Sequence, residues 1–253
     1  VFQLKEAVGV EVIRARESAV LARVLGTWRA VPSMEILGNL AAERLSIVSF
    51  VVRAPGAGGR AGRYLHHNFV VALLNDLFGI QSRGGCSCAG PYGHRLLGID
   101  LDRSHEFERE ISGGCEGIKP GWVRVNVNYF VSDVVVDYLI KAVVFVAEHG
   151  WRLLGDYRFD VATGRWHHRA GPVEPPLRLG QICYDAATGE MLYPHHDDPV
   201  PESALAGYLD EAIAIVSATV DPGLGPNDPE PTGLSEDFER LRWFELPATC
   251  LRS

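Results

Sequence analysis

The chain is poor in lysine, in methionine and in long apolar runs. Of its 253 residues three are lysines, and acidic residues outnumber lysine plus arginine by 32 to 24. No segment interleaves basic with aromatic residues, and the formal net charge is -8. This charge balance disfavours binding to a nucleic acid backbone or to anionic lipid headgroups. We therefore expect the partner to be neither a nucleic acid nor a membrane.

The most apolar run is too short to cross a bilayer. It extends from Val134 to Ala147 and is interrupted by Asp137 and Lys141, whereas a membrane-spanning helix needs roughly 20 predominantly apolar residues. The run predicts a buried helix instead.

Cysteines are few and irregularly placed. The sequence has five of them, an odd number, and no recognisable secretory signal peptide. Such a set is typical of reduced thiols and not of a disulfide framework. We therefore expect a cytoplasmic protein.

An initiating methionine is also absent. The sequence begins at Val1, and its two methionines are Met34 and Met191. Residues 1–9 have the pattern of a helix end closed by a glycine. We expect this chain to begin partway through a longer protein.

Hydrophobic periodicity predicts an α/β or α+β layer in residues 1–150. Three- and four-residue spacing of apolar side chains predicts helices over 10–29, 68–78 and 133–148, the second with Asn68 as its N-cap and Gly79 at its end. Strands are expected at 36–37, 44–53 and 122–128. Residues 54–59 are expected to form a loop, and residues 92–121 a less regular insertion.

Residues 151–253 predict a hairpin-rich extension. Residues 157–166 and 182–192 share one pattern, an alternating strand that turns at Asp-x-Ala-Thr-Gly. Aspartate favours turn initiation and glycine allows a left-handed residue, so each predicts a β-hairpin. We further expect a helix over 201–219, a linker over 221–231, and an apolar segment at 241–244 that docks on the body.

The segment Gly79–Pro91 carries the residues best suited to chemistry. It sets Arg83, Cys86 and Cys88 among glycines that let the backbone approach a ligand closely. An arginine beside a cysteine favours the nucleophilic thiolate. The alternative is that both cysteines simply pack under a loop.

Arg124 is the second candidate. It lies in the alternating segment Val123–Asn128 between valines that are expected to face inward. A rigidly held arginine can bind a carboxylate through two parallel hydrogen bonds. The alternative is an arginine on the solvent face of the strand.

Together these features resemble the C-terminal part of class V aminotransferases, the fold-type I pyridoxal-phosphate family that includes cysteine desulfurases and selenocysteine lyases. The resemblance covers about residues 1–150. It rests on the order strand, helix, "GI-x-x-R-x-G", cysteine, "R-x-(S/N)" strand and long helix. The matching segments are 45–52, 68–78, Gly79–Gly85, Cys88, Val123–Asn126 and 133–148.

The resemblance implies the α/β small domain of such an enzyme and assigns roles to three residues. Cys88, five positions after Arg83, matches the desulfurase nucleophile, and Arg124 matches the arginine that pairs with the substrate α-carboxylate. Arg83 is implied as a second substrate-binding residue. The substrate would be an amino acid, and desulfurase, lyase and aminotransferase chemistry stay open. The full-length protein would be a homodimer.

The resemblance also implies pyridoxal phosphate as cofactor, held by a lysine. Lys5, Lys119 and Lys141 do not match the position of that lysine, since none follows a histidine as it does in the family. We therefore expect the cofactor-binding domain to lie upstream and this chain alone not to transaminate. The predicted organisation is a small domain over 1–150 and a hairpin-rich extension over 151–253.

Two other functions compete with this interpretation. Cys86, Cys88, Cys115 and the run 195–198, His-His-Asp-Asp, are residue types that bind zinc, although their spacing is not that of paired CxxC motifs. The extension could instead serve as a dimerisation or docking surface. The pairs at 66–67 and 167–168 are expected to be satisfied or exposed histidines, with His67 the better catalytic candidate.

Overall fold

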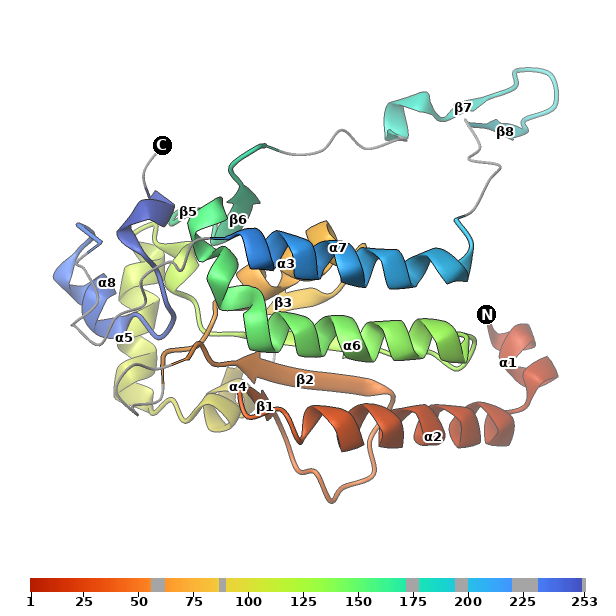
Figure 1. Cartoon of the computed structure of the whole chain (residues 1–253), viewed down its shortest axis with the longest axis horizontal. Coiled ribbons are helices and arrows are strands. Elements are labelled where there is room, and N and C mark those ends of the chain that lie inside the picture. Colours follow the sequence, from red (N-terminus) through yellow and green to blue (C-terminus); the bar gives the residue numbers. More distant parts are fainter. Residues whose placement is uncertain (56–61, 87–89, 172–177, 194–199, 220–231, 252–253) are drawn as a thin grey trace.

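The chain has a mixed α/β fold, as the sequence predicts. The computed structural model describes residues 1–55, 62–86, 90–171, 178–193, 200–219 and 232–251. Within these ranges lie a four-stranded antiparallel sheet, two separate β-hairpins and a set of helices (Figure 1).

The helices are, in chain order, α1 Phe2–Val8, α2 Val10–Trp28, α3 His67–Phe78, α4 Gly90–Leu97, α5 Leu101–Ser112, α6 Asp133–His149, α7 Leu205–Ala218 and α8 Glu236–Leu241. The strands are β1 Met34–Ile36, β2 Ile47–Val52, β3 Arg83–Gly85, β4 Trp122–Asn126, β5 Tyr157–Asp160, β6 Arg165–His168, β7 Cys183–Tyr184 and β8 Met191–Leu192.

The central strand of the sheet is β4. The strand order is β1-β2-β4-β3, and β4 pairs antiparallel with both β2 and β3. Because successive side chains of a strand point to opposite faces, Val123 and Val125 face the main core, whereas Trp122, Arg124 and Asn126 face the other side. We call this second side the open face.

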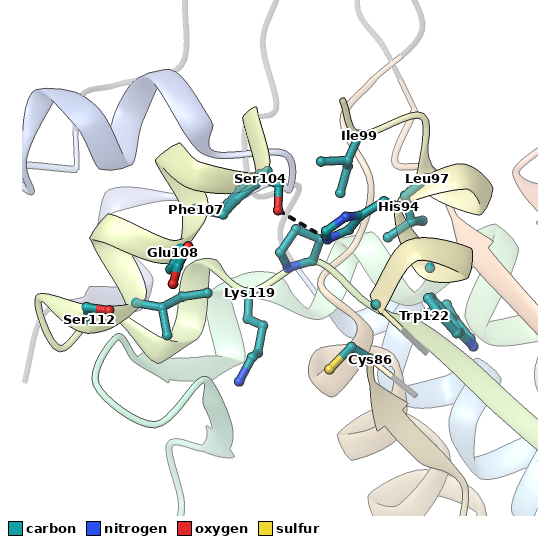
Figure 2. A pocket seen from close by; sticks show the side chains of 14 residues that line it. Cys86, His94, Leu97, Ile99, Ser104, Phe107, Glu108, Ser112, Lys119 and Trp122 are labelled. Atoms are coloured by element: carbon teal, nitrogen blue, oxygen red, sulfur yellow. Dashed lines mark hydrogen bonds between the residues drawn. The ribbon is translucent and has the colours of Figure 1, made fainter. Parts of the chain in front are cut away.

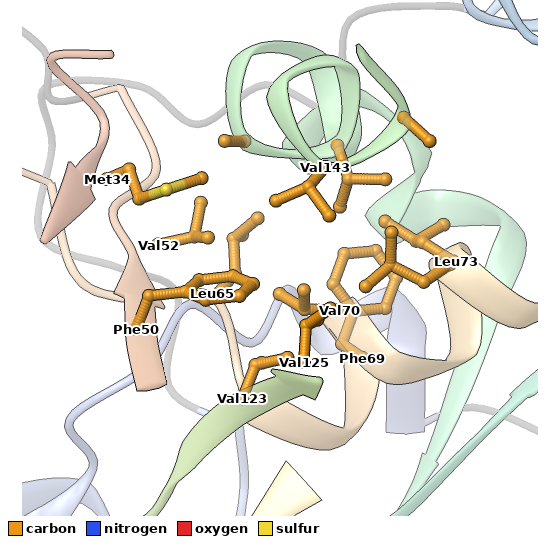
Figure 3. Close-up of a cluster of buried hydrophobic side chains, with 14 of the residues drawn as sticks. Met34, Phe50, Val52, Leu65, Phe69, Val70, Leu73, Val123, Val125 and Val143 are labelled. Carbon is orange, nitrogen blue, oxygen red and sulfur yellow. The ribbon is translucent and has the colours of Figure 1, made fainter. Parts of the chain in front are cut away.

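Helices α2, α3 and α6 supply the apolar side chains that cover the main core. Figure 3 shows Val143 of α6 and Val70 of α3 packed over Phe50 and Val125 of the sheet. Trp28 of α2 meets Phe50 edge-on, with ring centroids 5.3 Å apart. These helices form where the apolar spacing predicts them.

One end of the open face is covered by α4. Leu37, Val51 and Trp122 form a small second cluster, against which Leu97 packs. Gly93 of α4 lies directly over the indole of Trp122, since a Cβ at this position would be 3.4 Å from the ring. Arg124 belongs to neither cluster.

Both predicted hairpins form, and they turn in the same way. Asp160 accepts a hydrogen bond from the backbone N–H of Ala162 at 2.9 Å, and Asp185 accepts one from Ala187 at 2.9 Å. The glycine that ends each turn motif has a positive φ, of 68° and 71°. The repeated pentapeptide therefore encodes one turn geometry twice.

The C-terminal segment docks on the body, as predicted. Phe244 is fully buried, and the backbone N–H of Glu245 donates to the Tyr64 carbonyl at 2.8 Å. The indole N–H of Trp243 donates to the carbonyl of Ile118 at 3.0 Å. The main core thus continues past residue 150 through the hairpin β5–β6 and this segment. The division into two domains at residue 150 stays a prediction.

No strand is expected from the sequence around Arg83, yet the structure has one there. Arg83–Gly85 forms β3, because its backbone pairs with β4. Two of its three residues are glycines, which have little intrinsic strand preference, so the pairing alone fixes this strand.

Residues 92–121 were expected to be irregular, but much of this segment is helical, in α4 and α5. Pro91 lies in the first turn of α4, where a missing N–H costs nothing. Asp100 caps α5 by accepting from the N–H of Arg103 at 2.8 Å. The many charged residues of α5 conceal its short apolar stripe.

The N-cap of α3 is His66 and not Asn68. The ring of His66 accepts from the backbone N–H of Asn68 at 3.2 Å. Gly79 ends the helix in the left-handed conformation, as predicted. The predicted loop at 54–59 and the linker at 221–231 lie largely or wholly outside the described residues.

Gly121 is required where the chain enters β4. A Cβ at this position would lie 2.6 Å from the backbone of Gly85 and 2.6 Å from the ring of His67. Gly121→Ala should therefore lower the free energy of unfolding by about 1–3 kcal/mol. Gly26→Ala is the control, since nothing lies within 4 Å of its position on α2, and it should raise that energy by up to about 1 kcal/mol. Urea denaturation measures both, and equal stability of the two variants would contradict the packing.

Candidate functional site

The two arginines predicted to bind substrate are direct neighbours across the sheet. Arg83 of β3 pairs with Arg124 of β4, which also pairs with Ser49 of β2. Residues directly opposite in antiparallel strands point to the same face with their Cβ atoms about 4.5–5.5 Å apart. Ser49, Arg124 and Arg83 therefore form one row across the open face.

Neither arginine is neutralised within the described ranges. Their side chains make no hydrogen bond or ion pair with any described residue. Arg83 is exposed and Arg124 is half-buried. Arg242, by contrast, is buried and pairs with Glu239 at 3.0 Å. Like charges directly opposite each other destabilise a sheet, so the row has the composition of an anion site and not of a structural salt bridge.

Cys86 lies at a cavity beside this row and is exposed. The cavity has a volume of about 440 Å³ and lies between α4, α5 and the start of β4. Trp122 and Phe107 supply part of its apolar wall, and Figure 2 shows Cys86 and Lys119 at one side of it. Arg83 does not line this cavity.

The side of the cavity facing α5 carries a polar pair. The Nε2 atom of His94 lies 3.4 Å from the hydroxyl oxygen of Ser104 (Figure 2). Lys119 forms an ion pair with Glu116 at 3.2 Å. The cavity therefore combines apolar walls and an accessible thiol with the His94–Ser104 pair and the charged Lys119.

Cys88, the predicted nucleophile, lies outside the described residues, as does the run 195–198. Cys115 follows α5, and burial together with the nearby Glu110 raises the pKa of its thiol. Within the ranges that the structure describes, no three histidine, cysteine or acidic side chains gather as a metal site would require. Cys86 and Cys115 thus do not share a metal site with a third described residue.

No lysine stands at the arginine row. Lys5 is exposed on α1, and Lys141 is exposed on α6, which covers the opposite face of the sheet. Lys119 lines the cavity. The arginine row itself therefore includes no lysine, and the lysine of the adjoining cavity, Lys119, is ion-paired with Glu116.

His66 and His67 are buried behind β3 and are hydrogen-bonded. The Nε2–H of His66 donates to the carbonyl of Gly117 at 3.2 Å, since its Nδ1 already accepts from Asn68. His67 has Nδ1 2.9 Å from Oδ1 of Asn68 and Nε2 3.3 Å from the carbonyl of Lys119. The two rings stack on Trp243. Both are core histidines, in line with the expectation from sequence. His66 has both ring nitrogens satisfied, whereas His67, when neutral, donates to one of its two oxygen neighbours at a time.

Burial sets the protonation state of this pair. It drives the pKa of His66 well below its usual range, and the adjacent His67 lowers it further. Burial also lowers the pKa of His67 to about 4, against the opposing effect of its hydrogen bonds to Asn68 and Lys119. Both rings are neutral at pH 7. His167 and His168, in contrast, are exposed at the end of β6.

Two neighbours of the arginine row are not among the residues predicted from the sequence. Ser49 adjoins Arg124 across the sheet, and Trp122 shares its face of β4. The period-two pattern of β4 could have placed Trp122, Arg124 and Asn126 together. Ser49 becomes visible only once the register of β2 and β4 is known.

The chain matches no protein-family model, and no curated protein matches it. No helix in the described part of the chain is long and apolar enough to cross a membrane. Any assignment of function therefore depends on the residues of the site.

The neutral histidine pair predicts a pH-dependent stability. The unfolded chain binds protons at histidine below about pH 6.5, whereas the folded chain keeps His67 neutral down to about pH 4. Stability should therefore be fully present above pH 6.5 and fall as the pH drops below it, with His67 contributing up to about 1.4 kcal/mol per pH unit.

Urea denaturation at several pH values between 7.5 and 5 measures this slope. His67→Gln should flatten the slope, whatever its effect on stability at pH 7.5, whereas the exposed His167→Gln should leave it unchanged. A slope in His67→Gln equal to that of the wild type would show that this ring takes up a proton in the folded state.

Proposed function

We propose that this chain binds the carboxylate of an amino-acid substrate through Arg83 and Arg124, as the small-domain part of a pyridoxal-phosphate enzyme of class V aminotransferase type. The observation that carries the proposal is the direct cross-strand pairing of two arginines without a carboxylate partner in the described chain. An anionic ligand relieves the repulsion between them. The resemblance of residues 1–150 to that family supports the choice of an amino acid.

The chemistry of guanidinium fits this task. Arginine presents its N–H donors in a planar fork that matches the two oxygens of a carboxylate. Arg124 is held on the central strand between Ser49 and Arg83, so its backbone is fixed on both sides. A rigid strand positions a substrate more accurately than a loop does. Arg124 orients the carboxylate, and Arg83 adds a second positive charge from the exposed edge strand.

The residues of this chain do not by themselves fit pyridoxal phosphate. A Schiff-base lysine is absent from the arginine row, as described above. We therefore derive no step through the cofactor and propose that the lysine and the phosphate-binding groups come from another segment. This chain alone is inactive in that proposal, and the complete enzyme is a cytoplasmic homodimer.

Cys88 and Cys86 have different roles in this proposal. Cys88 is proposed as the nucleophile if the enzyme is a desulfurase, by its spacing from Arg83. Cys86 lines the cavity beside Trp122 and has no catalytic role in the proposal. The choice between desulfurase, lyase and aminotransferase chemistry depends on Cys88 and on the cofactor-binding segment.

Carboxylate binding can be tested on this chain without cofactor. We expect L-alanine to shift the side-chain NMR resonances of Arg83 and Arg124 saturably, and L-alaninamide, which lacks the carboxylate, to leave them unshifted. Arg124→Ala should weaken L-alanine binding about 10- to 100-fold, because a hydrogen bond to a charged group contributes about 1.5–3 kcal/mol.

Two variants separate this effect from a general loss of positive charge. Arg124→Lys keeps the charge but loses the planar fork, and should bind more weakly than the wild type. Arg14→Ala removes an arginine of α2 that pairs with Glu43, and should bind normally. Equal responses to L-alanine and L-alaninamide, or unchanged affinity in Arg124→Ala, would refute the site.

A further inference from the structure

The second hairpin is an exposed apolar arm. We define the arm as residues 178–193, which contain β7 and β8. None of its residues is buried, and Leu179 and Tyr184 are 87% and 68% exposed. No arm residue belongs to either hydrophobic cluster. Figure 1 shows the arm standing apart from the helices and the main sheet.

An isolated two-stranded hairpin is marginally stable in water. The first hairpin shares the turn motif of the arm, but it buries Tyr157, Phe159 and Trp166 in the main core. The arm has equivalent apolar side chains in Tyr184 and Met191, yet these remain in solvent. The arm therefore lacks the surface that stabilises its counterpart.

A groove of about 1220 Å³ lies beside the first hairpin. Its walls are α3, β6, the short helix Gly150–Asp156 and α7. Apolar side chains from three of these elements line it, and a set of polar side chains adjoins them. The apolar residues are Val71, Ala72, Leu77, Leu153 and Ile215; the charged ones are Asp76, Asp156 and Arg165, with His167 and His168 beside them.

All four residues of β6 line the groove, and no described strand pairs with β6 on the side away from β5. The N–H of Arg169 donates to the carbonyl of Asp156 at 2.9 Å. In an antiparallel ladder hydrogen-bonded pairs alternate with non-bonded ones. Trp166, opposite Phe159, is thus in a non-bonded pair, and its backbone N–H and C=O point away from β5.

Buried polar groups at the groove wall also lack partners. The indole N–H of Trp166 and the hydroxyl of Ser82 are buried and make no hydrogen bond with any described residue. Trp166 itself is 5% exposed.

We propose that the arm of one copy of this chain docks in the groove of a second copy, adding a strand to the free edge of β6. One chain carries both halves of the contact, an uncovered apolar hairpin and an apolar groove with an unpaired strand edge. The arm carries charges of both signs, and so does the groove, so that opposite charges can pair across the contact: Arg178, Asp185 and Glu190 in the arm, and Asp76, Asp156 and Arg165 in the groove. Two copies can exchange arms reciprocally through one two-fold axis. This inference is independent of the proposed carboxylate site.

The oligomeric state of the full chain tests the proposal. We expect a dimer by sedimentation equilibrium in the wild type. Tyr184→Lys with Met191→Lys should weaken it about tenfold or more, because interface energy concentrates in a few large side chains. Both positions are solvent-exposed, so the fold should survive. Leu45→Lys, a 73% exposed position outside the arm and the groove, should leave the dimer intact.

A crosslink identifies which surfaces meet. Cys183 of the arm is exposed, and Gln81→Cys places a thiol at the groove, in a background of Cys86→Ser and Cys88→Ser. A short bismaleimide should link the two positions between copies and give a covalent dimer, lost when Tyr184→Lys and Met191→Lys are added. A monomeric wild type, a dimer insensitive to the arm substitutions, or a crosslink only within one chain would each overturn the proposal.

Discussion

The pairing of β4 with β2 on one side and β3 on the other gives the sheet one apolar face and one face that carries the candidate site. Val123 and Val125 bind the sheet to the helices, while Arg124 stands on the opposite face. Since a strand alternates its side chains strictly, the packing of the valines fixes the direction of the arginine. A shift of one residue in register would bury the arginine and expose the valines. The hydrophobic core therefore positions the candidate site.

The C-terminal segment with Trp243 and Phe244 also packs against the elements that hold the sheet. The ring of Trp243 stacks on both His66 and His67 at the start of α3, and Phe244 meets His66 edge-on. The backbone of Gly84 and Gly121 fits closely against His67. The placement of β3 thus depends on residues that follow it by more than half the chain length, and Arg83 depends on β3.

Much of this architecture is predictable because it is local. The apolar spacing of α2 and α6 and the Asp-x-Ala-Thr-Gly turns each carry their structure within a few residues. β3 is different, because Gly84 and Gly85 have no strand preference and only contact with β4 makes them a strand. The prediction of Asn68 as the N-cap of α3 was wrong, because the cap is the buried ring of His66, and histidine is not among the usual N-cap residues.

The sequence also indicates the site only in part. Arg83 and Arg124 could be singled out by their motifs and by a family resemblance, but their direct opposition follows from the register of two strands far apart in the chain. The same holds for the groove beside β6, which combines four elements. Properties that arise from non-local pairing have no signature in a single sequence window.

The opposed arginines have a consequence for how this protein can evolve. Their repulsion makes the sheet less stable than one with a neutral residue at either position, so under the proposed function the pair is a case of function in conflict with stability. Drift toward greater stability would replace one arginine with a small or polar residue and leave the core untouched. Under the proposed function, carboxylate binding is what maintains the pair against this drift.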